Sequence, residues 1–188
     1  MIEPHFRLAV ADDVPAIAAV VNAANSGAGG WTNEAHLFHG NRTDEAEVAQ
    51  LLAVPGSTFV LSMGVGQVMG CAYLRFTGKD AYLGLLSVLP RRQGRGFGSE
   101  LLAECERFAY VDLGCQRLCI SVITSHRPEL ATFYERRGFA RTGKFKTFER
   151  KQALQGKKVD GMLLEWMEKS LSVPASRESR TRFMPNLI

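Results

Sequence analysis

Apolar residues recur at strand spacing in some segments of this chain and at helical spacing in others, and these segments predict strands and helices in alternation. A short apolar segment at 6–10 predicts a strand. A pair of aspartates and Pro15 then supply the residue types typical of a helix N-terminus, before a helical pattern at 16–24. Residues 45–53 repeat apolar positions at helical spacing. The N-terminal part therefore predicts a strand followed by two helices.

The middle of the chain predicts an antiparallel hairpin and then a buried strand. Apolar runs at 58–63 and 68–76 flank a glycine-containing turn at 64–66. Residues 81–89 are almost continuously apolar, as expected for a strand buried on both faces. Further along, the same patterns predict a helix at 99–114, a strand at 117–124, a helix at 128–138 and a last strand at 161–168.

Length and composition predict one folded domain and a tail. The chain has 188 residues, of which 46% are hydrophobic, which is enough for one well-buried core. We assign residues 1–169 to this domain. Residues 170–188 are rich in Ser, Arg and Pro without any periodicity, so we expect a disordered C-terminal tail.

Charge and cysteine usage exclude several classes of protein. The net charge is +4, but basic and acidic residues are intermixed, which does not favour a nucleic-acid-binding surface. No apolar stretch approaches the roughly 20 residues needed to cross a bilayer. The four cysteines follow no metal-ligand spacing and no signal segment precedes the domain. We therefore expect a cytoplasmic protein with reduced thiols, no bound metal and no membrane partner.

A glycine- and arginine-rich loop stands between the buried strand and the next helix. Residues 91–98 contain three arginines and three glycines. A turn of this kind exposes backbone N–H groups at a helix N-terminus, with no Cβ atom to obstruct an approaching anion. Arg91, Arg92 and Arg95 add charge for phosphoryl groups. The loop lacks both the Walker ending and the dinucleotide G-x-G-x-x-G spacing, so it predicts a different pyrophosphate ligand.

Two motifs resemble one known family. "LLSVLPRRQGRGFGSELL" resembles the acetyl-coenzyme A motif of the GNAT superfamily of N-acetyltransferases, whose Q/R-x-x-G-x-G/A signature falls on Gln93, Gly96 and Gly98. Downstream, "ATFYERRGF" resembles the family's later segment, with Tyr134 four residues before Gly138. The resemblance covers about residues 5–168. It implies an α/β fold of the α+β type, in which helices flank a mixed central sheet with a V-shaped splay between two central parallel strands.

The same resemblance implies that acetyl-coenzyme A is the cofactor. Its pantetheine arm would enter the splay between the strands at 82–89 and 117–124, with the Leu86 amide facing the thioester carbonyl oxygen. Many family members have Asn at the position of Arg127, so one pantetheine contact differs here. The cofactor-binding residues implied in this way are Leu86, Ser87, Val88, Gln93, Gly94, Arg95, Gly96, Phe97, Gly98 and Ser99.

The implied activity is transfer of an acetyl group to a primary amine of a small molecule or peptide, by direct attack of the amine on the thioester. Tyr134 is the candidate general acid, because a tyrosine hydroxyl stays protonated at neutral pH. Glu34 is the candidate base, with His36 and His39 as alternatives in the same loop, and His126 could also face the cofactor. The candidate acceptor-binding residues are Trp31, His36 and Arg42.

Two other classes of function stay open. A non-catalytic relative could bind acyl-coenzyme A as a sensor or interaction module, and it would tolerate the loss of Tyr134, which this chain keeps. A nucleic-acid binder would use the arginines of the loop and the tail, but it lacks interleaved aromatic residues. The sequence leaves the acceptor amine and the oligomeric state open, a homodimer included.

Overall fold

The computed structural model describes residues 5–26, 40–125, 127–147 and 162–172. Strands and helices alternate within these ranges, as the sequence patterns predict. The strands are β1 (His5–Leu8), β2 (Ser57–Gly64), β3 (Gln67–Thr77), β4 (Asp80–Val88), β5 (Arg117–Ile123), β6 (Ala140–Thr147) and β7 (Leu163–Ser170). The helices are α1 (Val14–Ser26), α2 (Glu45–Leu52), α3 (Phe97–Arg107) and α4 (Pro128–Glu135).

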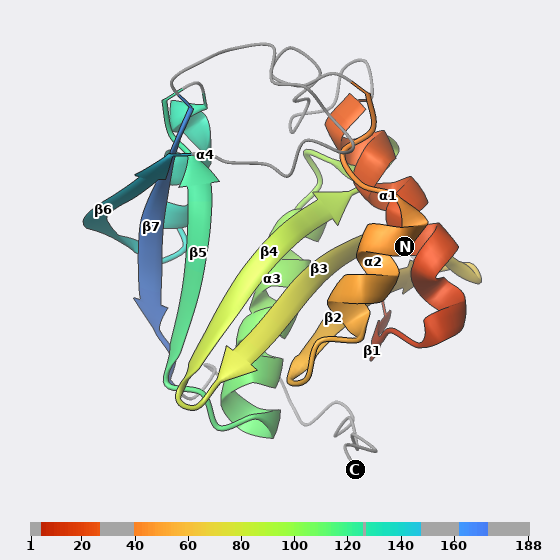
Figure 1. Ribbon diagram of the computed structural model, residues 1–188, viewed down its shortest axis with the longest axis horizontal. Coiled ribbons are helices and arrows are strands. Elements are labelled where there is room, and N and C mark those ends of the chain that lie inside the picture. Colours follow the sequence, from red (N-terminus) through yellow and green to blue (C-terminus); the bar gives the residue numbers. More distant parts are fainter. Residues whose placement is uncertain (1–4, 27–39, 126, 148–161, 173–188) are drawn as a thin grey trace.

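A mixed seven-stranded sheet in the order β1-β2-β3-β4-β5-β7-β6 forms the centre of the molecule. Figure 1 shows α1 and α2 on one face of this sheet and α3 on the other. A separate apolar core fills each interface. Ile17, Val21 and Phe59 belong to the core under α1 and α2, whereas Leu101 and Phe108 belong to the larger core under α3 and α4. This architecture confirms the fold class expected from the sequence.

The sequence patterns missed one strand and overextended two helices, of which the one expected at 128–138 ends at Glu135. β6 was not predicted, because nearly all of its side chains are exposed and it has no alternating apolar pattern. It is the edge strand next to β7, so pairing with β7 alone determines its position in the sheet. The helix expected at 99–114 begins two residues earlier and turns into a π-helical turn at 108–112. β7 also continues to Ser170, one residue beyond the expected end of the domain.

The two central parallel strands pair only near one end. Their register runs from Asp80 opposite Arg117 to Leu83 opposite Ile120. An ion pair between Arg117 and Asp80, at 2.8 Å, ties the strands together at the start of this pairing. Beyond Leu83, β4 keeps β3 as its partner and β5 keeps β7, so the two strands diverge as the V that Figure 1 shows. The sheet therefore has a gap at its centre.

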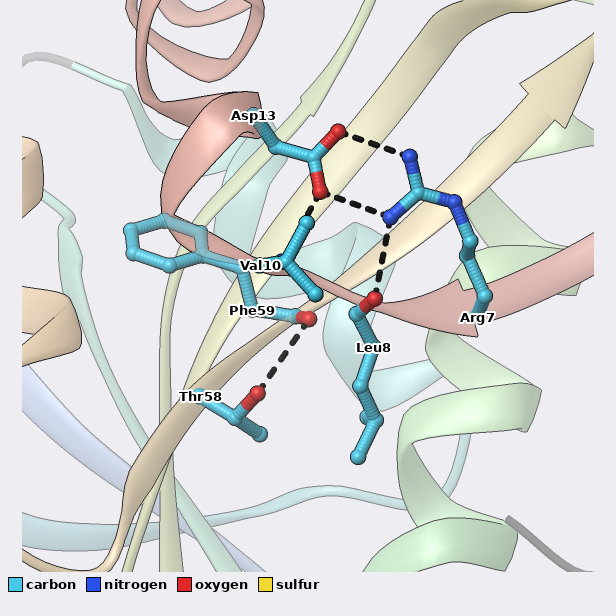
Figure 2. A network of polar contacts seen from close by, with 6 residues as sticks. All are labelled: Arg7, Leu8, Val10, Asp13, Thr58 and Phe59. Carbon is cyan, nitrogen blue, oxygen red and sulfur yellow. Dashed lines mark hydrogen bonds and ion pairs between the residues drawn. The ribbon is translucent and has the colours of Figure 1, made fainter. Parts of the chain in front are cut away.

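A charged network fixes the turn between β1 and α1. The Arg7 guanidinium donates to both carboxylate oxygens of Asp13, at 2.6 and 2.7 Å, and also to the Leu8 carbonyl. The Val10 N–H donates to the same carboxylate at 2.8 Å. Figure 2 shows this network beside Phe59 of β2. Asp13 is only 8% exposed, and its hydrogen bonds with Arg7 hold its pKa below the ordinary value.

None of the helices in the described part of the chain has the length and apolarity that crossing a membrane requires. The same ranges contain no cluster of His, Cys, Asp or Glu side chains that could hold a metal ion.

Replacing Asp13 with Asn should lower the free energy of unfolding by roughly 1–3 kcal/mol at pH 7, because charge-assisted hydrogen bonds are lost from a buried carboxylate. The difference from wild type should shrink below about pH 4, the ordinary pKa, since the unfolded chain then takes up the proton first. Urea unfolding of both proteins at several pH values measures this difference in the free energy of unfolding.

Asp80→Asn is the matched control, because it breaks an ion pair between two exposed side chains and should change stability less. An Asp13→Asn difference that does not change with pH would contradict the role of the charged network.

Candidate functional site

A cavity of about 560 Å³ occupies the gap between β4 and β5. Its size is within the range of pockets for small molecules and cofactors. Three parts of the chain that are distant in sequence form most of its wall. These are Tyr82, Gly84, Leu85, Leu86, Ser87 and Val88 on β4, Gln93, Gly94, Gly96, Gly98 and Ser99 in the loop and α3, and Ser121, Val122, Ile123, Leu130, Phe133, Tyr134 and Arg137 on and after β5 and α4.

The β4 wall of the cavity contains a β-bulge. Tyr73 pairs with Gly84 and Cys71 pairs with Ser87, so β4 has one more residue than β3 in this stretch. Leu85 has a positive φ of 50°, which costs roughly 1–2 kcal/mol for a residue with a side chain. The bulge takes Leu85 and Leu86 out of the ladder with β3, and β5 has already diverged from β4. Backbone groups of this stretch are therefore left for a ligand.

The sequence marks this bulge only by Gly84, directly before Leu85, because an isolated Gly inside a strand often accompanies a bulge. The apolar pattern of residues 81–89 does not show it. Only the tertiary structure shows that the positive φ falls on Leu85 and that the strand bends where it lines the cavity.

The glycine loop forms an open cradle at the N-terminus of α3. Gly94 and Gly96 have φ of 73° and 87°, in the left-handed region that favours glycine. A Cβ atom added to either would meet no atom within 4 Å, and one added to Gly98 would meet only Val88, at 3.9 Å. Ser99 N and Glu100 N both donate to the Gly96 carbonyl, at 2.9 and 3.0 Å. The amides just before them lack intrahelical partners, so the cradle fits a diphosphate.

The arginines of the loop do not line the cavity. Arg91 donates to the Gln67 side chain at 3.0 Å, and the Arg92 guanidinium lies 5.5 Å from the centre of the Phe97 ring. Arg95 and Phe97 are also absent from the cavity wall, unlike the other eight cofactor-binding residues expected from the sequence. Phosphoryl contacts by the loop arginines stay a prediction.

Gln93 has a local role that the sequence did not indicate. Its side-chain amide donates to the Val88 carbonyl at 2.8 Å, which holds the loop against the end of β4. Among the described residues, the cation that enters the cavity next to the cradle is Arg137 of the segment after α4, and sequence reasoning missed it. Its position in "YERRGF" beside a second arginine gave no reason to choose it.

Tyr134 reaches the cavity from α4. It is 9% exposed and packs edge-on against the rings of Phe133 and Phe139, at centroid distances of 5.1 and 5.4 Å. Burial raises its pKa above the ordinary value of about 10, because leaving water penalises the phenolate, while nearby Arg137 acts in the opposite direction. No hydrogen bond from another described residue contributes to this shift of the pKa. Its proton is therefore available to a ligand.

The cavity wall also contains Asn25, Arg42 and a pair of hydroxyls. Tyr82 Oη and Ser121 Oγ are 3.0 Å apart, bridging β4 and β5 just where they diverge. Arg42, one of the acceptor-binding residues expected from the sequence, lies in the cavity wall. The candidate residues Trp31, Glu34, His36, His39 and His126 lie outside the described residues.

Arg127 does not line the cavity. It is 5% exposed, stands at the start of α4 and forms an ion pair with Glu129. Its guanidinium thus has a partner within the protein, and the altered pantetheine contact expected at this position stays a prediction.

The cysteines fill the cores. Cys71, Cys105 and Cys115 are buried, and no cysteine lines the cavity. Burial raises the pKa of the Cys71 thiol to about 12. No thiolate is thus positioned to act as a nucleophile in the part of the cavity that the structure describes.

Comparisons with known proteins agree with this geometry. Residues 55–141, which include β2 to β5, the glycine loop and α4, match the family described as the acetyltransferase (GNAT) domain. No curated protein matches the sequence.

Many solved structures share the fold, each at low sequence identity. A putative GNAT acetyltransferase from Desulfovibrio desulfuricans is 20% identical, with a TM-score of 0.69 over 90% of this chain and 100% of that one. The ribosomal-protein-S18-alanine N-acetyltransferase of Escherichia coli is 16% identical, with a TM-score of 0.67 over 95% and 100%. A putative acetyltransferase from Salmonella typhimurium, solved with its cofactor acetyl-CoA, is 20% identical, with a TM-score of 0.63 over 95% and 100%.

Replacing Gly98 with Val should weaken binding of acetyl-coenzyme A at least about tenfold, because the new side chain would occupy space that the cradle leaves open. Isothermal titration calorimetry measures the dissociation constant, and circular dichroism should show an unchanged fold.

Ala103→Val is the matched control, since it adds the same side chain to the exposed face of α3. Equal affinities for all three proteins would mean that Gly98 serves the turn alone.

Proposed function

We propose, from the premise that this chain contains a GNAT acetyltransferase domain, that it transfers an acetyl group from acetyl-coenzyme A to a primary amine of a small molecule or peptide. The observation that carries the proposal is the convergence of three features on one cavity. The freed backbone of β4, the glycine cradle and the hydroxyl of Tyr134 all line it.

The cradle and the splay would hold the cofactor by its two ends. Backbone amides at Gly96 and Gly98 are suited to the diphosphate, because nothing in the protein obstructs an anion there. The unpaired edge of β4 from Leu86 to Val88 would pair with the pantetheine arm, much as a missing strand would. Acetyl-coenzyme A supplies a thioester, whose acetyl group an amine can accept.

The Leu86 amide would stabilise negative charge on the thioester carbonyl oxygen. The bulge at Leu85 holds this part of the backbone out of the ladder with β3. A donor fixed by the fold needs no reorganisation when charge develops, which is the basis of oxyanion stabilisation in acyl transfer. We assign the backbone strain at Leu85 to this function.

Tyr134 would protonate the thiolate that leaves. Because its pKa lies above the ordinary value, the hydroxyl carries its proton throughout the neutral and mildly alkaline range. The raised pKa makes the buried hydroxyl a weaker acid. A thiolate that leaves in the same buried environment also has a raised proton affinity, so proton transfer between the two stays feasible.

The base that deprotonates the attacking amine stays a proposal from the sequence. The described cavity wall contains neither a carboxylate nor an imidazole. Glu34 is our candidate, with His36 and His39 as alternatives, and all three lie outside the described residues. Trp31, His36 and Arg42 would contribute to acceptor binding.

A thiol-release screen tests the activity itself. Acetyl-coenzyme A is offered with a panel of amines, amino acids and peptides, and free coenzyme A is detected. Release that depends on an acceptor supports the enzyme, whereas cofactor binding without any turnover would favour a non-catalytic sensor.

Acetyl-coenzyme A should stabilise the folded protein, because it binds the cavity and not the unfolded chain. At about 100 times the dissociation constant, the gain is roughly 2.7 kcal/mol. Thermal melts measure it, with NAD and ATP as controls that share the diphosphate but not the pantetheine arm. A melting temperature unmoved by millimolar acetyl-coenzyme A would overturn the cofactor assignment.

Tyr134→Phe keeps the ring packing against Phe133 and Phe139 but removes the proton donor. We expect kcat to fall by roughly 10²-fold, with the dissociation constant of acetyl-coenzyme A nearly unchanged. Tyr110→Phe, on the π-helical turn away from the cavity, is the control. If the two variants retain the same kcat, Tyr134 is a packing residue.

A further inference from the structure

Arg137 is held at the edge of the cavity by its own helix end. Its guanidinium stacks on the Phe133 ring, 3.6 Å from the ring centre. Its Nη1 donates to the Phe133 carbonyl at 2.7 Å, which is one of the last-turn carbonyls of α4. These two contacts fix the plane of the guanidinium and leave its Nε and Nη2 edge pointing away from α4.

That remaining edge has an unusually weak partner. Both Nε, at 3.2 Å, and Nη2 donate to the same hydroxyl oxygen of Ser99. A two-donor edge of arginine matches the two oxygens of a carboxylate or phosphate, and one neutral hydroxyl oxygen does not use it fully. The geometry therefore presents an anion-binding edge that contacts a neutral group.

Five described arginines have carboxylate partners, whereas Arg137, which lines the cavity, has none among the described residues. Burial lowers its pKa, since a partly buried cation has lost water without gaining an opposite charge. The arginines paired with carboxylates are Arg7, Arg107, Arg117, Arg127 and Arg141.

The partner of Arg137 also stands in an unfavourable place for a cation. Ser99 is in the first turn of α3, directly after the glycine cradle. The N-terminus of a helix carries partial positive charge, so a guanidinium there adds charge of the same sign. The arrangement becomes favourable when an anion lies between them.

This inference rests on the proposed function. We propose that Arg137 is a specificity-determining residue for the acyl donor, whose Nε and Nη2 edge exchanges the Ser99 hydroxyl for an oxygen of the donor's diphosphate. The protein then distinguishes coenzyme A thioesters from thioesters that have the same pantetheine arm without a diphosphate. The Ser99 hydroxyl, once released, can donate to the same group.

Binding measurements on Arg137→Gln test the proposal without any need for turnover. Three ligands are compared by calorimetry or ligand-observed NMR: coenzyme A, dephospho-coenzyme A, which lacks the ribose phosphate but keeps the diphosphate, and pantetheine, which has neither. We expect Arg137→Gln to bind the first two about tenfold more weakly, and pantetheine within about twofold of wild type.

Arg136→Gln is the matched control, because it removes the same charge from the adjacent, exposed residue and should weaken coenzyme A binding less than about threefold. Arg137→Lys keeps the charge without the two-donor edge, and we expect an intermediate loss. Circular dichroism and melting temperature verify that each variant is folded.

Five results would overturn the inference. Equal losses in Arg136→Gln and Arg137→Gln would indicate a general charge effect, and an equal loss for pantetheine would indicate packing alone. A loss seen with coenzyme A but not with dephospho-coenzyme A would place Arg137 at the ribose phosphate. Unchanged coenzyme A affinity in Arg137→Gln refutes only this inference, whereas a wild-type protein that does not bind coenzyme A refutes the proposed function as well.

Discussion

The separation of β4 from β5 after Leu83 is the constraint on which the rest of the structure depends. A central pair of strands normally satisfies its backbone groups by pairing, and unpaired buried backbone groups cost free energy. Here the pairing stops while both strands continue, and a cavity of about 560 Å³ occupies the space between them. The fold thus contains a row of backbone donors and acceptors on the facing edges of β4 and β5 that the two strands do not pair with each other.

The surrounding structure holds this gap open from both ends. At the closed end, the parallel ladder from Asp80 to Leu83 and the bond from Gln116 N to the Lys79 carbonyl keep the strands together. Toward the open end, each strand keeps its outer neighbour, and the cores under the helices support the two halves of the sheet. The bulge at Leu85 then turns backbone groups away from β3. The strain at that residue is tolerated because packing on both sides determines its position.

Different parts of the cavity wall have different chemical properties. The glycine cradle and Arg137 supply positive charge at one end, suited to phosphoryl groups. The Tyr134 hydroxyl lies in a largely apolar environment, where burial keeps it protonated. This division of roles supports acyl transfer from a phosphorylated donor more readily than a site built for polar recognition alone.

The sequence by itself determined the features that depend on neighbouring residues. The alternation of strands and helices and the cradle of Gly94, Gly96 and Gly98 follow from periodicity and glycine sterics. The choice of Tyr134, which lines the cavity, follows from a motif of adjacent residues that resembles a known family. Local residues decide such features because they act through the backbone angles and side-chain spacing of one segment.

Only the tertiary structure decided the features that depend on distant partners. Arg137 meets Ser99 across 38 residues of sequence, and β6 exists because β7 offers it an edge. The bulge at Leu85 arises where β4 pairs with β3 on one side and diverges from β5 on the other, and the local sequence marks it only by Gly84. The contact of Arg137 with Ser99 and the position of β6 have no local signal, because packing between separate elements sets them. Sequence periodicity reports the burial of a face without identifying what covers it.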